Sequence, residues 1–212
     1  MRYLLLISTA LSFQACTGPY KALRKTSTGP DCVFLLKPAF TTALYNTSVN
    51  VAGKHLSGLL IIKKMPDSSI RIVFSNEAGF KFFDFGFLNG EFKVNYIYRD
   101  LDKKPVIRTL RKDFQLLLMY NMAPAVGYLL KSDNKNNNSN YYTFPRGEDH
   151  YYYITDSLCQ HMIRMERGNR RKPVMTAIAE NFSQGTPDTI GITHSNFRFD
   201  IGLKRIYNYA ER

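Results

Sequence analysis

Histidine and acidic side chains are the groups in this sequence that could carry chemistry, and their spacing matches no catalytic motif. Asp84 lies between Phe83 and Phe85, where apolar surroundings can raise the pKa of a carboxyl group and make it an acid or a base. The alternative is an outward-facing or hydrogen-bonded aspartate. No G-x-S-x-G turn is present, and no HExxH or comparable pair includes any of the four histidines, His55, His150, His161 and His194. We therefore expect a protein that is not an enzyme and that uses no cofactor or metal.

Cysteine chemistry is indicated near the N-terminus. Arg2 is followed by an apolar run over 3–13, and Gln14 and Ala15 then precede Cys16. The run has the length of the hydrophobic region of a signal peptide, and it is shorter than the roughly 20 residues that cross a bilayer. The segment resembles the lipobox of bacterial lipoproteins, which implies removal of residues 1–15 and lipidation of Cys16. The alternative is an ordinary signal peptide that is cut elsewhere, with Cys16 incidental.

The residues after Cys16 indicate where such a lipoprotein resides. No Asp follows the cysteine, so the inner-membrane retention signal is missing, and residues 17–25 lack the acidic cluster of surface-exported lipoproteins. We expect a lipid anchor in the outer membrane, with the protein on the periplasmic face. Residues 17–25 are rich in Gly, Pro and Lys and predict a flexible tether. The division expected is a tether and N-terminal segment over 16–40, followed by a single domain over 41–212.

The charge balance and the two remaining cysteines each leave two interpretations. The formal net charge is +12, which favours anionic partners. Behind a signal peptide, anionic lipid head groups or lipopolysaccharide are better candidates than nucleic acid, and plain solubility is the alternative. Cys32 and Cys159 form a disulfide in an oxidising compartment or remain two buried thiols. No metal-ligand spacing surrounds them.

Alternating apolar residues predict a chain dominated by β-strands, in line with 15 Phe and 14 Tyr. Asn89-Gly90 is a strong hairpin signal, and the short turns around it predict antiparallel neighbours. A turn is predicted over 52–54 and a polar loop over 132–140. The predicted strands cover 41–51, 57–64, 69–75, 80–88, 91–98, 150–155, 158–166, 173–182, 189–193 and 197–206. About ten or eleven antiparallel strands imply a mainly β protein with a strongly curved sheet or an unclosed barrel.

One segment departs from this pattern. Apolar residues over 105–120 repeat at helical spacing, and Pro105 suits a first helical turn. Arg108, Arg111 and Lys112 occupy the other side of the predicted helix. This basic face predicts contact with anionic lipid. The alternative is a helix whose apolar side packs on the sheet while its basic side is solvated.

The order of these elements resembles the LolA/LolB-like family of bacterial lipoprotein-localisation proteins. The likeness is sharpest over 69–85, a strand, Asn-x-x-Gly turn and strand; 57–64 fits the preceding strand, and 187–206 resembles the closing hairpin. The resemblance implies an unclosed antiparallel β-barrel whose concave face is covered by helix and holds an apolar cavity. The lipobox favours the membrane-anchored receptor type over the soluble carrier.

The resemblance also implies particular site residues. In the family, the Asn-x-x-Gly loop carries a large apolar residue at the membrane; here the loop is Glu77, Ala78 and Gly79, and Ala78 has little apolar surface to bury. Plain core packing is the alternative for every residue assigned to the cavity. The cavity residues implied are Ile70, Ile72, Phe74, Phe80, Phe82, Phe92, Val94, Tyr96, Phe199, Ile201 and Leu203.

The function implied is the acceptance of acyl chains or acylated lipoproteins from a periplasmic carrier protein. Exposing a chain of about 16 carbons to water costs on the order of 12 kcal/mol, so such a protein must offer an apolar cavity. Because the sequence holds no nucleotide motif, transfer would run downhill in affinity. The alternative is a structural or assembly lipoprotein that binds another envelope protein or an anionic glycolipid. An open interior favours the first function, and a filled interior favours the second.

Overall fold

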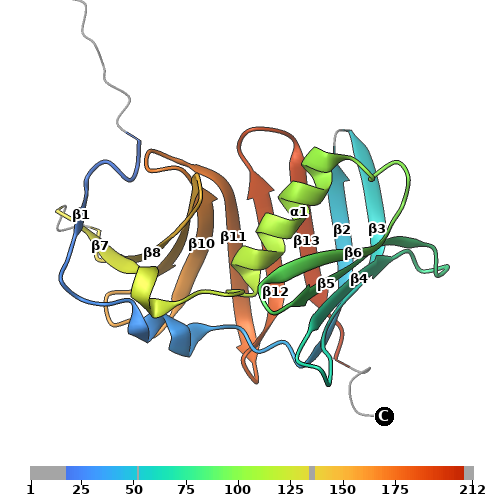
Figure 1. Cartoon of the computed structure of the whole chain (residues 1–212), viewed down its shortest axis with the longest axis horizontal. Coiled ribbons are helices and arrows are strands. Elements are labelled where there is room, and N and C mark those ends of the chain that lie inside the picture. Colours follow the sequence, from blue (N-terminus) through green and yellow to red (C-terminus); the bar gives the residue numbers. More distant parts are fainter. Residues whose placement is uncertain (1–17, 52, 134–136, 208–212) are drawn as a thin grey trace, which may run out of the picture.

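The computed structural model describes residues 18–51, 53–133 and 137–207 (Figure 1). The predicted signal peptide, Cys16, Ala52 of the predicted turn and residues 134–136 of the polar loop lie outside the described residues. Within the described ranges, no helix is long and apolar enough to cross a membrane. In the same ranges, no group of three His, Cys, Asp or Glu side chains is placed to hold a metal ion.

The strands of the described chain form one antiparallel sheet of thirteen. The edge strands β1 and β6 do not pair with each other, so the sheet is not closed. This confirms the expected mainly β fold with a curved, unclosed sheet. The order across the sheet is β1 (Leu23–Lys25), β7 (Tyr128–Ser132), β8 (Asn140–Arg146), β9 (Asp149–Thr155), β10 (Met162–Gly168), β11 (Pro173–Ser183), β12 (Thr186–His194), β13 (Phe199–Arg205), β2 (Thr42–Val51), β3 (Lys54–Lys64), β4 (Ile70–Ser75), β5 (Lys81–Leu88) and β6 (Glu91–Ile97).

In the middle of the sheet, the last described strand in the sequence, β13, pairs with the second strand in the sequence, β2. Strand β13 pairs on one side with β12 and on the other with β2, where Ile201 lies opposite Val49. Both side chains are buried on the concave face, as the alternation in the two segments predicts. Strand β13 therefore connects the β2–β6 half of the sheet to the β7–β12 half.

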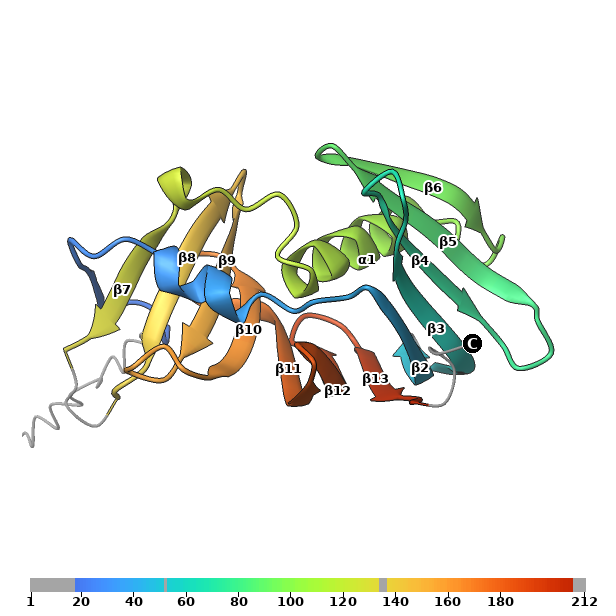
Figure 2. The ribbon, with the colours of Figure 1, turned by 90° about the horizontal axis from the view of Figure 1, so that it is seen from below.

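Helices cover the concave side of this sheet. Helix α1 (Lys104–Leu117) connects β6 at one edge to β7 beside the other edge. Figure 2 shows the sheet curving around α1, with the short helix η1 (Asp31–Leu36) beside β8 and β10. A second short helix, η2 (Pro124–Val126), precedes β7. The main core therefore lies between α1, η1 and the inner face of the sheet.

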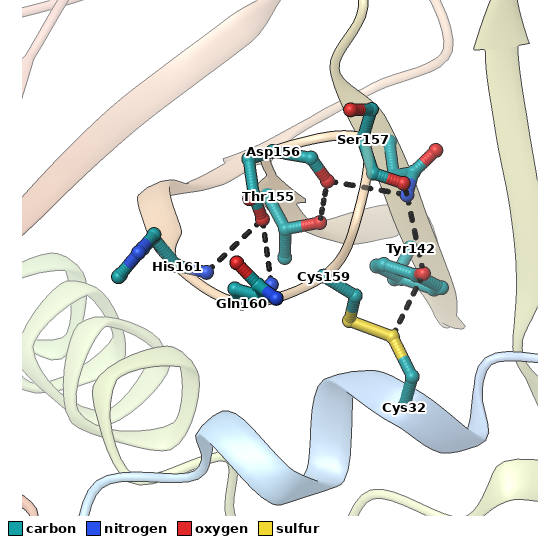
Figure 3. The surroundings of a disulfide bond; sticks show 9 residues. Cys32, Tyr142, Thr155, Asp156, Ser157, Cys159, Gln160 and His161 are labelled. Atoms are coloured by element: carbon teal, nitrogen blue, oxygen red, sulfur yellow. Dashed lines mark hydrogen bonds between the residues drawn. A yellow bond between two sulfur atoms is a disulfide. The ribbon is translucent and has the colours of Figure 1, made fainter.

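A disulfide holds η1 in place. Cys32 in η1 is bonded to Cys159 in the turn between β9 and β10, 127 positions later (Figure 3). In that turn Asp156 accepts hydrogen bonds from the backbone N–H groups of Gln160 (2.7 Å) and His161 (3.0 Å). These bonds order the turn that presents Cys159 to η1. Of the two alternatives for the cysteines, the structure shows the disulfide.

The predicted hairpin at Asn89-Gly90 is confirmed. Asn89 and Gly90 have positive φ values of 49° and 85°. Positive φ at both central residues is characteristic of the type I′ turn, whose twist matches that of the strands it connects. Asn and Gly tolerate this conformation better than other residues do.

Several boundaries differ from the prediction. Strands β1, β7 and β8 were not expected, and β10 begins at Met162 because the disulfide-bearing turn occupies the preceding residues. The predicted tether over 17–25 is wrong in its described part. Tyr20 is buried, and Leu23–Lys25 pairs with β7, so aromatic packing and strand pairing outweigh the Gly, Pro and Lys content.

Candidate functional site

Helix α1 is the element that shapes the interior. Pro105 lies in its first turn, where a missing N–H and a fixed φ cost nothing. Val106, Leu110, Phe114 and Leu117 follow at helical spacing and form one apolar side. Leu110, Phe114 and Leu117 are buried against the sheet. The predicted helix is thus confirmed, and it ends three residues earlier than expected.

Polar contacts fix the C-terminal half of α1. The hydroxyl groups of Tyr151 and Tyr153 donate hydrogen bonds to the carbonyl groups of Lys112 (3.3 Å) and Leu116 (3.0 Å). Lys112 also pairs with the carboxylate of Asp149. Burial raises the pKa of Tyr151 to about 12, so its hydroxyl group remains a donor at neutral pH.

A buried cluster of Asp113, Arg167 and His194 also attaches the C-terminal half of α1 to the sheet. Asp113 accepts a hydrogen bond from Arg167 of β10 (3.0 Å), and its second oxygen lies 3.0 Å from Nε2 of His194 at the end of β12. Nδ1 of His194 donates to the carbonyl oxygen of Phe199 (2.8 Å). The three charged or polar side chains are at most 8% exposed. Breaking such a buried group leaves an uncompensated charge, so it resists separation of α1 from the sheet.

The N-terminal half of α1 is held differently. No side chain caps its first turn. Within the described residues, no hydrogen bond or ion pair joins the side chains of 104–110 to the sheet. Its contacts with the core are apolar and come from Val106 and Leu110. The two halves of the helix therefore differ in how firmly they are attached.

An apolar crevice lies between this loosely held half and the sheet. Its volume is about 20 Å³, room for about one water molecule, whereas pockets that hold small-molecule ligands measure roughly 300–1,000 Å³. The large cavity implied by the family resemblance is therefore not open in this structure, because α1 fills it. The lining residues are Leu101, Val106, Leu110 and Phe114 on the helix side, and Val49, Val51, Leu56, Leu60, Phe74, Phe83, Phe199 and Ile201 on the sheet.

The crevice has a rim at one end. Val51, Leu56, Leu101 and Val106 are partly exposed, whereas the residues deeper in the crevice are buried. Val51 ends β2, Leu56 lies near the start of β3, and Leu101 precedes α1. The crevice therefore opens at the end of the sheet where α1 begins.

Most of the predicted cavity residues belong to this core. Phe74, Phe199 and Ile201 line the crevice itself. The others are part of the surrounding packing, so for them the core alternative holds. Buried are Ile72, Phe74, Phe82, Phe199, Ile201 and Leu203, and half-buried are Ile70 and Phe92.

The assignment of three residues to the cavity is wrong. Phe80, Val94 and Tyr96 are 43%, 37% and 42% exposed. A β-bulge between Asp84 and Phe85 shifts the register, so Tyr96 pairs with Asp84 on the outer face while Val94 pairs with Phe85 on the inner face. Val94 remains exposed because β6 is an edge strand, and Phe80 precedes β5. A one-residue shift of this kind moves a side chain to the other face.

Asp84, the candidate acid or base, has several hydrogen-bond donors around its carboxylate. The carboxylate of Asp84 accepts hydrogen bonds from Arg71 (2.9 and 2.6 Å), Lys81 (3.3 Å) and Asn95 (3.2 Å). Burial alone raises the pKa of Asp84, but the hydrogen bonds from Arg71, Asn95 and Lys81 outweigh it and hold the pKa below its usual range. The hydrogen-bonded alternative is therefore the correct one.

Two of the three basic residues predicted on the outer side of α1 contact other side chains. Arg108 and Arg111 are exposed, and the Arg111 guanidinium lies 5.7 Å from the centre of the Phe92 ring. Lys112 is paired with Asp149, and the apolar side of the helix packs on the sheet. Packing on the sheet accounts for the apolar side of this helix, and contact of its basic side with anionic lipid stays a prediction.

The predicted membrane loop lies at the turn between β4 and β5. Glu77, Ala78 and Gly79 are exposed, and Asn76 closes the turn by accepting a hydrogen bond from the Phe80 N–H (2.7 Å). Contact of this loop with a membrane stays a prediction.

Sequence reasoning missed the helix side of the crevice and the group that fixes α1. The helical spacing of Val106, Leu110 and Phe114 is the sequence signal that could have identified the helix side of the crevice. Asp113, Arg167 and His194 are far apart in the chain, and no local pattern connects them.

No protein-family model matches the chain, and no curated protein matches it. Among solved structures, the chain is similar to a DUF1329 family protein from Desulfovibrio piger, at 10% identity over 87% of this chain and 93% of that one, with a TM-score of 0.46. It is also similar to a putative outer membrane lipoprotein-sorting protein domain from Vibrio parahaemolyticus, at 10% identity over 87% and 94%, with a TM-score of 0.39. Likeness at this level carries no functional argument.

Proposed function

We propose that this chain is a lipid-anchored protein of the bacterial outer membrane, on the periplasmic face, that binds acyl chains between helix α1 and the sheet. The signal peptide pattern and Cys16 support the anchor. The observation that carries the binding function is the crevice, which is lined by apolar side chains and closed by the half of α1 that lacks polar contacts with the sheet.

The crevice enlarges when the N-terminal half of α1 moves away from the sheet. Leu110 is buried and Val106 is partly exposed, so exposing both costs at most about 6 kcal/mol, at about 1.5–3 kcal/mol for each fully buried side chain. Burying about eight methylene groups of an acyl chain, at about 0.8 kcal/mol each, offsets that cost. The contacts of Asp113, Tyr151 and Tyr153 keep the far half of the helix attached. A chain of ordinary fatty-acid length can thus replace the helix without unfolding the domain.

Transfer follows from relative affinities. The protein accepts an acylated cargo from a periplasmic carrier that binds it more weakly, and then releases it to the bilayer. A ligand shifts an equilibrium only by its difference in affinity for the two states, so no other energy source is required.

A fluorescent fatty acid tests the proposal. Val106→Gln places an amide in the crevice, and Ile107→Gln is the matched control, because Ile107 is a neighbouring, partly exposed residue of α1 outside the crevice lining. We expect V106Q to weaken binding about tenfold or more, and I107Q to bind like the native chain. Native protein that binds no fatty acid, and from which mass spectrometry recovers no lipid, would contradict the proposal.

A second function is favoured by the filled interior and by the outer edge of the sheet. Among the described strands, β6 pairs only with β5, and it exposes Val94 and Tyr96. An exposed apolar edge strand is a site for pairing with another chain. If the fatty-acid experiment fails, the proposed function is instead a structural role in which another envelope protein binds strand β6.

A further inference from the structure

The first described residues are held firmly against the sheet. Tyr20 is 5% exposed, stacks on Tyr152 at 4.1 Å between ring centres, and donates a 2.5 Å hydrogen bond to Glu166. Gly18 lies so close to the β10–β11 turn that a Cβ atom there would meet the carbonyl oxygen of Arg171 at 2.0 Å. Figure 1 shows this start of the described chain beside that turn. The chain therefore enters the domain at a defined place.

This place limits the distance between the turn and a lipid anchor. Cys16 precedes Gly18 by two residues in the sequence, and two residues of chain span at most about 7 Å. The head-group layer on each side of a bilayer is roughly 5–8 Å thick. If Cys16 is acylated, as the proposed function requires, the β10–β11 turn lies at head-group depth.

The turn is built to meet anionic groups. Arg170, Arg171 and Lys172 are consecutive and exposed. The side chain of Asn169 orders them by accepting hydrogen bonds from the N–H groups of Arg171 (2.7 Å) and Lys172 (3.0 Å). Basic residues near a membrane surface are attracted by anionic lipids, and two or three together add substantially to binding.

Other features occupy the same end of the sheet. Because neighbouring strands are antiparallel, the β10–β11 and β12–β13 turns lie at one end, together with the last residue of β2. The β12–β13 turn exposes Phe197 (43%) and Arg198. Val51 places the crevice rim there as well. An anchor, basic residues, an exposed aromatic ring and an apolar opening thus share one end.

We propose that this end, which we call the anchor end, lies on the bilayer, with Arg170, Arg171 and Lys172 on the phosphate groups of anionic phospholipids. The crevice rim then faces the membrane, so an acyl chain passes between bilayer and crevice with little exposure to water. This orientation deepens the proposed function and rests on its lipid anchor.

The absence of Trp from the sequence allows a direct measurement. Phe197→Trp places a single reporter at the anchor end. Phe182→Trp is the matched control, because Phe182 is equally exposed (44%) and lies at the opposite end, in the β11–β12 hairpin. Each lipidated mature protein is incorporated into vesicles of phosphatidylglycerol and brominated phosphatidylcholine. We expect quenching and a blue shift of the F197W emission, and neither for F182W.

A charge-matched pair of variants tests the lipid contact. In the F197W background, Arg171→Gln with Lys172→Gln is compared with Lys63→Gln and Lys64→Gln, which remove two exposed charges from the opposite end. We expect the first pair to lose the extra quenching that phosphatidylglycerol gives over phosphatidylcholine alone. The second pair retains it.

Each outcome decides a separate point. Mature protein without acyl groups on Cys16, by mass spectrometry, overturns the anchor and this orientation together. Acylated protein that is quenched equally at positions 182 and 197 overturns the orientation and leaves acyl-chain binding to the V106Q experiment. Quenching of F197W that does not depend on phosphatidylglycerol or on Arg171 and Lys172 overturns the phosphate contact.

Discussion

Removal of the disulfide between Cys32 and Cys159 should strongly destabilise this protein. Cys32 and Cys159 are 127 positions apart, and their Cα atoms lie at 6.5 Å. A cross-link that closes a loop of this length lowers the entropy of the unfolded chain, a stabilisation of about 5 kcal/mol at 25 °C in the chain-entropy treatment. Because domains are stable by only about 5–15 kcal/mol, the loss is a large part of the total.

The folded state adds to this effect. The bond holds η1 over the sheet, where Val33 is fully buried and the Phe34 ring meets Phe144 edge to face at 5.7 Å. A chain without the bond retains these contacts only while η1 stays docked. We expect the variant Cys32→Ser with Cys159→Ser to lose roughly 4–5 kcal/mol and to expose η1 to protease before the rest of the domain.

Urea unfolding measures the loss. The native chain in a reducing agent should match the double variant, and the double variant should not respond to the reducing agent, which controls for other effects of the reagent. Changes below about 1 kcal/mol in both experiments would refute the reasoning, because they would mean that the unfolded chain gains little freedom when the loop opens.

Three further changes test other parts of the structure. Burial raises the pKa of Asp84, but hydrogen bonds from Arg71, Asn95 and Lys81 lower it overall, so the stabilisation by this carboxylate is present above the unfolded value of about 3.9 and is lost as the pH falls through the folded value. Asp84→Asn should therefore cost about 1–2 kcal/mol at pH 7, and urea curves should converge with the native ones below about pH 4; a constant difference would contradict this. Asp113→Asn leaves Arg167 buried without its carboxylate and should cost about 3–5 kcal/mol in the same assay, whereas a near-native midpoint would argue against a charged group there. Tyr20→Phe keeps the ring but removes the bond to Glu166, so limited proteolysis should release the N-terminal segment faster without a matching loss of global stability; unchanged cleavage would show that stacking alone holds it.

Local patterns in the sequence predicted much of the fold. Asn89-Gly90 identified a hairpin because few residues accept two positive φ values in succession. The alternation around Val49 and Ile201 identified strands and their inner faces, and the helical period around Leu110 identified α1. In each case the information lies within a few neighbouring residues.

The remaining features depend on partners that are distant in the chain. Tyr20 is buried only because Tyr152 and Glu166 are brought beside it. The face of Tyr96 changed because of a bulge opposite Asp84. The closed crevice could not be predicted either, because the volume left between a helix and a sheet depends on how all of the side chains fit together.

The position of β13 has a consequence for how the protein is made. This strand is the last of the described strands to be synthesised, yet β12 and β2 are joined through it. Until Phe199–Arg205 emerges, each half of the sheet exposes an unpaired edge at what will become the centre. Native pairing of the two halves therefore has to wait until β13 has been synthesised, although the strands within each half are present earlier.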